Sequence, residues 1–375
     1  MLTGVAAVAA ILLFITAHEA GHFFAAKATG MKVTEFFIGF GPRIWSFKRG
    51  DTEYGIKPIP LGAYVKVVGM SSLEEVDPAD HGRTYREKPF WAKSLVVLSG
   101  VAANFLLAFL LFIGLALASG KPVVRDGELV PSTTASAIVP DVDGKPTAAA
   151  QAGLLAGDTI TAVDGTPTPD WQTLSDTLAA LPGKEITLTV QRGGETLQVT
   201  TLLGSRVDTA TGETKGFLGV APSTLMEPVG VIESVGIAGR AVWNGIGMTF
   251  DFFGRVFRID TIGQLIGGLG GKEVPQDVRP VSVVGIYQIG TQAQQFGVLN
   301  FLGMLAFVNV ILGTVNVVPL FPLDGGHFAV AVYEKLTGKT ADMRKLIPVA
   351  VAVVMLIGFV GLLSIALDIL NPIKV

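Results

Sequence analysis

Long uncharged, strongly apolar runs limit the possible folds of this chain more than any other feature. No charged residue occurs over residues 1–17, 94–120, 280–323 or 346–367, and in the third run apolar residues are densest between 297 and 319. About 20 apolar residues in a helix suffice to cross the hydrocarbon core of a bilayer. The sequence therefore predicts a polytopic α-helical membrane protein with about four transmembrane helices, the first continuing to Ala28.

Composition agrees with this class. Of the 375 residues, 50% are hydrophobic and only 16% are charged, against roughly 25% charged in soluble domains. The net charge of −3 gives no reason to expect a nucleic-acid partner. There is no cysteine, so disulfides and thiolate metal sites are excluded. Any bound metal ion must use histidines and carboxylates.

The distribution of lysine and arginine indicates the orientation of the spans. These residues concentrate in segments 27–93 and 335–345, which should be cytoplasmic by the positive-inside rule. Four spans then place both termini and residues 121–290 outside the cytoplasm. A cleaved signal peptide over residues 1–28 is the alternative, and it is disfavoured because no basic segment precedes the apolar run.

The sequence HEAGH interrupts the first apolar run with His18, Glu19 and His22. Residues four apart on a helix lie on one face, so the two imidazoles can share a divalent ion. Glu19 beside them could take a proton from water while that water attacks a carbonyl. The chain has only four histidines, and ionisable groups at membrane depth are costly. HEAGH therefore predicts a metal site more strongly than a pair of core histidines.

A catalytic zinc ion usually has three protein ligands and one open position, so a third ligand is needed. Asp324 is the preferred candidate, because it is the first ionisable residue after the run 280–323 and is followed by two glycines, which permit close backbone approach. An N-cap role is the alternative for this aspartate. His327 lies nearby, and His81 is expected in solvent within a charged loop.

Two asparagines lie within the apolar runs, Asn104 and Asn316. Pro319 and Pro322 should end the third helix near Asn316. Backbone groups freed at membrane depth are tolerated only beside protein or water, so an aqueous pocket is expected there. Both amides could bind a substrate backbone. Hydrogen bonding between helices is the alternative.

Residues 51–57 and 63–68 are predicted to form a β-hairpin around a Pro-Leu-Gly turn. A hairpin with an open edge offers unpaired backbone groups and could hold an unwound substrate by strand addition. The candidate residues for this edge are Gly62, Ala63, Tyr64, Val65 and Lys66. The alternative is a hairpin that only plugs the cytoplasmic side.

Residues 121–205 are predicted to form an inserted α+β domain. Short strand-like runs such as TITAV and EITLTVQR alternate with Asp-Gly and Gly-Gly turns, and DWQTLSDTLAALPG predicts a helix ending at Gly183. The segment AAAQAGLLAGDTITAVDG resembles bacterial PDZ domains, which bind an extended peptide at a sheet edge. Peptide capture and steric filtering both remain open, since no carboxylate-binding loop stands out over 121–139.

Residues 206–290 should be a connector whose amphipathic helices lie in the membrane interface or pack on the PDZ domain.

Several motifs together resemble the site-2 protease family of intramembrane zinc metalloproteases. They are HEAGH, GFGP, PIPLGAYVKV, GVAAN, a single PDZ insertion and NVVPLFPLDGGH. The resemblance covers most of the chain and is weakest over 206–279. It implies one zinc ion with ligands His18, His22 and Asp324, and Glu19 as the catalytic acid and base. It also implies a membrane-embedded β-loop at 51–68 that aligns substrate, and asparagines 104 and 316 as residues that help to hold it.

The expected organisation is an N-terminal membrane half (1–120), a PDZ domain (121–205), a connector (206–290) and a C-terminal membrane half (291–375). The chain should lie in the bacterial cell (inner) membrane, with the PDZ domain extracytoplasmic and the active site near the cytoplasmic side. The expected activity is regulated intramembrane proteolysis of single-span membrane proteins, with anti-sigma factors as the family precedent. A non-proteolytic metal transporter or sensor is one alternative, and a membrane-anchored PDZ scaffold with an inactive metal site is another.

Overall fold

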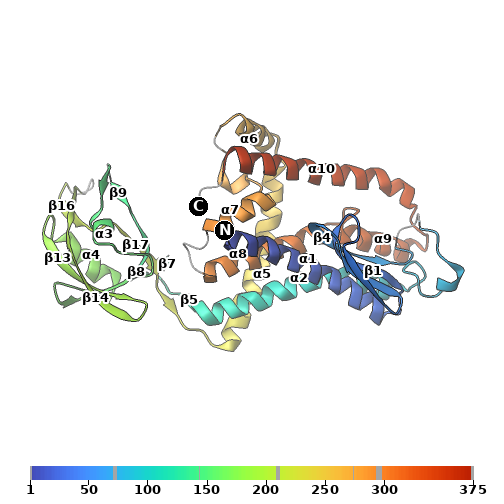
Figure 1. The fold of residues 1–375 in the computed structure, drawn as a ribbon, viewed down its shortest axis with the longest axis horizontal. Coiled ribbons are helices and arrows are strands. Elements are labelled where there is room, and N and C mark those ends of the chain that lie inside the picture. Colours follow the sequence, from blue (N-terminus) through green and yellow to red (C-terminus); the bar gives the residue numbers. More distant parts are fainter. Residues whose placement is uncertain are drawn as a thin grey trace. The chain divides into compact units, whose positions relative to one another are not determined.

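The computed structural model describes residues 2–70, 74–142, 144–207, 212–272, 274–292 and 298–372 (Figure 1). The chain forms two compact units. One consists of Met1–Ala118 together with Gly230–Val375, and the other is Ser119–Val229. The second unit is thus inserted between two segments of the first.

Four helices of the first unit are long and apolar enough to cross a membrane, which fits the predicted polytopic membrane protein. They are α1 (Leu2–Ala28), α2 (Phe90–Ser119), α8 (Val298–Val317) and α10 (Met343–Leu370). The helix α8 ends shortly before Pro319, because proline lacks the N–H that would continue the helix. Gly297, the expected start of this span, lies outside the described residues.

The segment between α1 and α2 folds into a four-stranded sheet in the order β2-β3-β1-β4. The strands are β1 (Val33–Phe40), β2 (Trp45–Arg49), β3 (Thr52–Ile56) and β4 (Ile59–Val67). The predicted hairpin of residues 51–57 with 63–68 is wrong. Both strands exist, but β1 lies between them, parallel to β3 and antiparallel to β4. The hairpin in this sheet is instead β2–β3, which pair antiparallel.

A close backbone approach at Gly39 explains this topology. The chain leaving β3 passes the end of β1, where the backbone N–H of Lys57 donates to the carbonyl oxygen of Ile38 at 2.8 Å. Gly39 has φ +89°, and a Cβ there would lie only 2.5 Å from the carbonyl oxygen of Lys57. Glycine at this position lets the chain cross to the far side of β1 before β4 begins.

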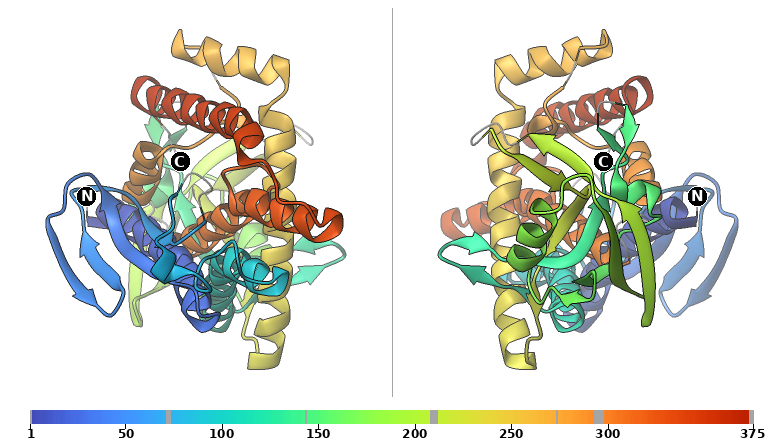
Figure 2. Two further views of the ribbon diagram at one scale, coloured as in Figure 1. Left: turned by 90° about the vertical axis from the view of Figure 1, so that its right-hand side faces the viewer. Right: turned by 90° about the vertical axis from the view of Figure 1, so that its left-hand side faces the viewer.

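Further helices complete the first unit. They are α5 (Val231–Val256), α6 (Ile259–Leu269), α7 (Val283–Gln292), α9 (Asp324–Thr337) and the 3₁₀ turns η1 (Pro78–Asp80) and η2 (Gln276–Val278). The helix α7 packs on α1, and α5 packs on α8 and runs across the direction of α1, α2 and α10 (Figures 1 and 2). The buried side of α5 includes the small residues Ser234, Ala238 and Gly245, whereas Trp243 is 75% exposed. The amphipathic helix expected in the connector therefore packs on α8.

The second unit is an α+β domain built on the strand order β14-β13-β11-β8-β17, with β12 paired to β11. These strands are β8 (Pro131–Ile138), β11 (Thr159–Val163), β12 (Thr166–Pro167), β13 (Glu185–Arg192), β14 (Glu195–Leu202) and β17 (Val220–Thr224). Two helices accompany them, α3 (Ala148–Gln151) and α4 (Trp171–Ala179). The core gathers apolar side chains from the sheet and from α4, namely Ile160, Leu174, Ile186, Leu188 and Val190.

Four short strand pairs complete the second unit. They are β5 (Lys121–Pro122) with β18 (Met226–Glu227), β6 (Val124–Arg125) with β7 (Glu128–Leu129), β9 (Asp141–Val142) with β10 (Lys145–Pro146), and β15 (Gly204–Val207) with β16 (Thr214–Phe217). The unit runs past residue 205 because β17 pairs with β8 and supplies the edge of the main sheet. Residues 208–211 of the expected connector lie outside the described residues.

The ion pair between buried Asp158 and partly exposed Arg192 leads to a prediction about the stability of this domain. Asp158 is 1% exposed and accepts hydrogen bonds from Nε and Nη2 of Arg192, both at 2.7 Å. These bonds hold the pKa of Asp158 below its ordinary value. Replacing it by asparagine should therefore destabilise the domain by roughly 2 kcal/mol at pH 7.

The effect should also depend on pH in a defined direction. A carboxylate whose pKa is lowered by folding contributes stability above its unfolded pKa of about 3.9, and that contribution is lost as pH falls through the folded value. Hydrogen exchange of β11 and β13 in the full chain should therefore separate Asp158→Asn from wild type at pH 7, and the difference should shrink progressively as pH falls below about 4. Exposed Asp141→Asn is the control, and equal exchange of both variants at pH 7 would contradict the prediction.

Candidate metal centre

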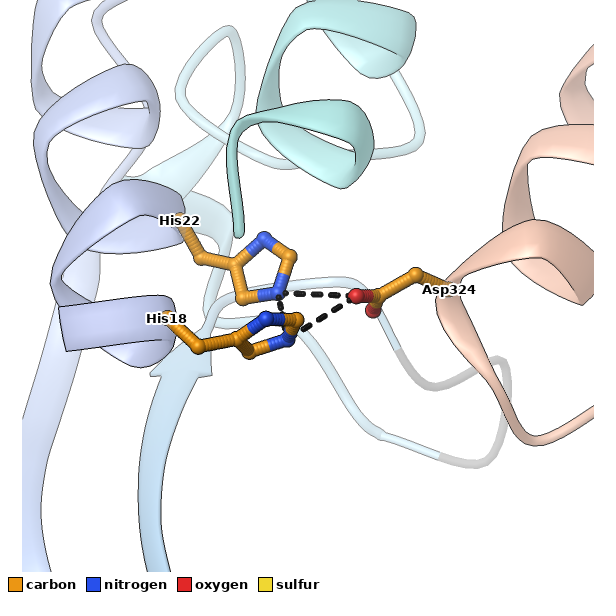
Figure 3. Close-up of side chains that lie close together, drawn as sticks. All are labelled: His18, His22 and Asp324. Atoms are coloured by element: carbon orange, nitrogen blue, oxygen red, sulfur yellow. Dashed lines mark hydrogen bonds and ion pairs between the residues drawn. The ribbon is translucent and has the colours of Figure 1, made fainter. Parts of the chain in front are cut away.

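Side chains from the two ends of the sequence meet in the first unit (Figure 3). The helix α1 presents His18 and His22 on one face, with their Nε2 atoms 3.1 Å apart. Oδ2 of Asp324, the first residue of α9, lies 3.0 Å from Nε2 of His18 and 3.3 Å from Nε2 of His22. The structure thus brings together the three residues that the sequence predicted as metal ligands. Leu323 occupies the cap position of α9, so Asp324 does not serve as the N-cap.

These three atoms fit a zinc ion. With bonds of about 2.0 Å in a tetrahedral site, ligand atoms lie roughly 3.3 Å apart, close to the observed separations. His18 and His22 are 7% and 8% exposed. Among the described groups, only the two imidazoles approach the buried Oδ2 of Asp324 closely. Two nitrogen donors and one carboxylate oxygen form a common ligand set of catalytic zinc, and they leave one position open.

Contacts behind the imidazoles set their orientation. Nδ1 of His22 lies 2.7 Å from the carbonyl oxygen of Val96 on α2. A carbonyl can only accept, so Nδ1 carries the proton and the lone pair of Nε2 faces the centre. His18 has its Nδ1 3.2 Å from the side-chain amide of Asn104, which is 1% exposed. The two ends of an asparagine amide are assigned from their hydrogen bonds. With the nitrogen and oxygen of the Asn104 amide exchanged, Oδ1 accepts a hydrogen bond from Nδ1–H of His18. This assignment also gives Oδ1 of Asn104 the partner that it otherwise lacks.

A third asparagine supports this arrangement and was missed by the sequence analysis. Nδ2 of Asn309, which is fully buried on α8, donates to the backbone oxygen of Asn104 at 2.9 Å. Its position inside the third apolar run was the available signal, because a buried amide needs a partner there. The helices α2 and α8 are therefore joined directly behind His18.

A cavity of about 240 Å³ opens beside the three ligands. Its lining includes both asparagines expected to contact substrate, and consists of Ile15, His18, Glu19, Asn104, Leu312, Asn316, Pro322, Leu323 and Asp324. The two amides differ in their contacts. Within the described part of the chain, the hydrogen bond of Asn316 goes to the backbone oxygen of Leu312 one turn earlier, whereas Asn104 is held against His18. Asn316 is therefore the freer of the two to bind another molecule.

Glu19 lies in the same cavity and also contacts the sheet. Its carboxylate lies close to the backbone N–H of Val65 in β4. The strand β4 packs on α1 and is an edge strand of its sheet. The predicted edge residues 62–66 are thus placed next to the candidate catalytic carboxylate.

The side chains of this strand have partners within their own unit. The hydroxyl of Tyr64 donates to Glu35 at 2.6 Å and accepts from Lys57 at 2.7 Å. Nζ of Lys66 lies 3.9 Å from Glu74. What this strand offers to another chain is therefore its backbone, as strand addition requires.

The two remaining histidines lie outside the cluster. The ring of His327 packs against Phe321, with centroids 4.5 Å apart. His81 contacts Glu87 at 2.8 Å, and its side chain is 67% exposed. The expectation that His81 lies in solvent is confirmed.

Comparison with known proteins relates the sequence of this chain to peptidases. The model of "Peptidase family M50" matches residues 6–360. Zinc metalloprotease Rip1 of Mycolicibacterium smegmatis is 31% identical over 395 residues, covering 98% of this chain and 97% of that protein. Zinc metalloprotease RasP of Shouchella clausii is 26% identical, covering 90% of this chain and 91% of that protein. The solved PDZ domain of an SdrC-like protein from Listeria monocytogenes matches 27% of this chain and 93% of its own, at 24% identity and a TM-score of 0.19.

A glycine on α2 yields a prediction about the metal centre. A Cβ at Gly100 would lie 2.4 Å from Nε2 of His22 and 2.8 Å from Nε2 of His18, the two atoms that would bind the metal. Gly100→Ala should therefore weaken zinc binding at least tenfold, the scale found for disturbed ligand orientation. Gly114→Ala is the matched control in the same helix, because no atom lies within 4 Å of a Cβ there. Zinc affinity measured by chelator competition checks this, and equal affinities of the two variants would contradict it.

Proposed function

This chain belongs to peptidase family M50, and we propose that it is an intramembrane zinc metalloprotease that cleaves the transmembrane segments of single-span membrane proteins. The observation that carries the proposal is the cluster of His18, His22 and Asp324 with Glu19 beside it. The cluster is built on α1, a candidate membrane span, and on α9, which follows another. A protease centre among such helices is suited to substrates that are themselves in the membrane.

His18, His22 and Asp324 would hold one zinc ion per chain. When bound, zinc supplies a Lewis acid that polarises the scissile carbonyl and makes water easier to deprotonate. Glu19 acts as the base that takes a proton from the attacking water as the oxygen–carbon bond forms. The carbon–nitrogen bond then breaks, and Glu19 returns the proton to the leaving amine. The backbone of Val65 lies beside the carboxylate of Glu19, which lines the cavity.

The substrate must lose its helical hydrogen bonds before a peptide bond can be attacked. The open edge of β4, through the backbone of residues Gly62, Ala63, Tyr64, Val65 and Lys66, would hold the unwound segment as an added strand. Asn316, which lines the cavity, would hydrogen-bond the substrate backbone. Asn104 would contribute less to substrate binding, because it already holds His18.

The substrates are membrane proteins, and anti-sigma factors are the class suggested by the family resemblance. The chain would lie in the bacterial inner membrane, with the 119–229 domain extracytoplasmic and the zinc site near the cytoplasmic side. The concentration of lysine and arginine in segments 27–93 and 335–345 supports this orientation. The 119–229 domain, expected to have the PDZ fold, would capture or filter substrates before they reach the site.

The replacement Glu19→Gln tests the mechanism. It should leave zinc content unchanged and lower cleavage of a model single-span substrate by 10²-fold or more, because a positioned general base contributes about 10²–10⁴-fold. Glu53→Gln is the control, since Glu53 lies on β3, where it pairs with Arg43.

The same variant separates proteolysis from metal transport. A transporter or sensor that used the three ligands would keep its metal-dependent activity in Glu19→Gln, whereas a protease would lose its activity. Elemental analysis of the purified protein together with cleavage in proteoliposomes gives both readouts. Undiminished cleavage by the variant would contradict the proposed function.

A further inference from the structure

The helix α9 carries Asp324 at its first residue and an ion pair near its last turn. Oε2 of Glu334 lies 2.9 Å from Nζ of Lys93, at the start of α2. The two side chains are only 26% and 13% exposed. This pair joins segments separated by 241 residues and connects the two halves of the sequence that supply the metal ligands.

Neighbouring contacts restrict both members of the pair. Nζ of Lys93 lies 5.7 Å above the ring of Tyr85, which is 8% exposed. The second carboxylate oxygen of Glu334 accepts a hydrogen bond from the backbone N–H of Ala341 at 3.2 Å. One turn along α9 from Asp324, Phe328 contacts Phe90 of α2, with ring centroids 6.3 Å apart. The helix α9 therefore contacts the first turn of α2 at two points, through Glu334 and through Phe328.

The same stretch of α2 also holds a ligand from α1. Val96, whose carbonyl accepts from Nδ1 of His22, is three residues beyond Lys93, about one helical turn. Thus α2 fixes His22 through a backbone carbonyl and fixes α9 through Lys93. Through these two contacts, α2 fixes the position of the histidines relative to Asp324.

The front end of α9 is tightly packed as well. A Cβ at Gly325 would lie 2.0 Å from the carbonyl oxygen of Val317 at the end of α8, so the turn before α9 leaves no free space. Asp324 and Glu334 are ten residues apart, or roughly 15 Å along the helix. A tilt of α9 by about 4° would displace its two ends relative to each other by roughly 1 Å, so the packing at one end and the ion pair at the other together set the position of Asp324. Such a displacement exceeds the tolerance of about 0.5 Å within which a metal site must be held.

We infer that Lys93 and Glu334 are positioning residues of the metal centre, whose ion pair holds α9 on α2 so that Asp324 lies beside His18 and His22. This inference rests on zinc binding by the three proposed ligands. It assigns the pair a role beyond stability, because residues that orient metal ligands change affinity 10–100-fold.

The test uses the full chain in detergent and measures zinc affinity by chelator competition. Lys93→Met and Glu334→Gln should each weaken zinc binding roughly tenfold. Lys93→Arg, which keeps the charge, should retain most of the affinity. The reversed pair Lys93→Glu with Glu334→Lys should recover most of what either single variant loses. In cleavage assays at saturating zinc, kcat should fall in the single variants while KM stays unchanged.

A second ion pair of the same unit provides the matched control. Nζ of Lys32 lies 2.6 Å from Asp80, with side chains 24% and 10% exposed. Both residues lie in the segment between α1 and α2, so Lys32→Met removes a comparable pair without touching α9. Its zinc affinity should equal that of the parent. Thermal unfolding of each zinc-free variant separates a loss of folding from a loss of metal binding.

The outcomes distinguish this inference from the proposed function. A parent chain that binds zinc, with Lys93→Met and Glu334→Gln binding it equally tightly, would overturn the positioning role alone. The positioning role would also be overturned if these variants lost no more zinc affinity than Lys32→Met does. It would be overturned likewise if the reversed pair bound zinc no more tightly than either single variant. A parent chain that binds no zinc would instead overturn the metal site on which the inference rests.

Discussion

The burial of two imidazoles and one carboxylate among apolar helices is the constraint on which the first unit depends. Polar groups at such a position are costly unless each is paired. The structure meets this requirement from several helices at once. Val96 and Asn104 on α2 contact the imidazoles, and Asn309 on α8 supports Asn104. Gly100 provides the space in which both Nε2 atoms fit.

The sheet between α1 and α2 determines how an extended substrate could reach this centre. Because β1 lies between β3 and β4, β4 remains an edge strand while it packs on α1. Its backbone then reaches Glu19 through Val65. A single strand thereby contacts the proposed base and keeps an edge to which an unwound chain could add. This arrangement links the topology of the sheet to the proposed choice of an extended substrate.

The differences between expectation and structure arise where long-range pairing outweighs local pattern. Residues 51–57 and 63–68 form strands as predicted, yet they flank β1, since strand order depends on the close approach at Gly39 and not on the intervening turn. Asn104 was interpreted as a substrate ligand, and its amide lies against His18. The strand β17, in the segment expected to be a connector, completes the sheet of the second unit. None of these pairings leaves a local signal in one sequence.

The sequence by itself determined the class of the protein and its reactive groups. Membrane-length apolar runs specify helices because lipid offers the backbone no other partners, and the spacing of His18 and His22 places them on one face because the α-helix has a fixed period. Only the tertiary structure decided that Asp324 joins them, that β4 is the open edge, and that Lys93 and Glu334 connect the two halves of the site. These contacts join residues far apart in the chain, and their geometry depends on how α1, α2, α8 and α9 pack, which no local pattern encodes.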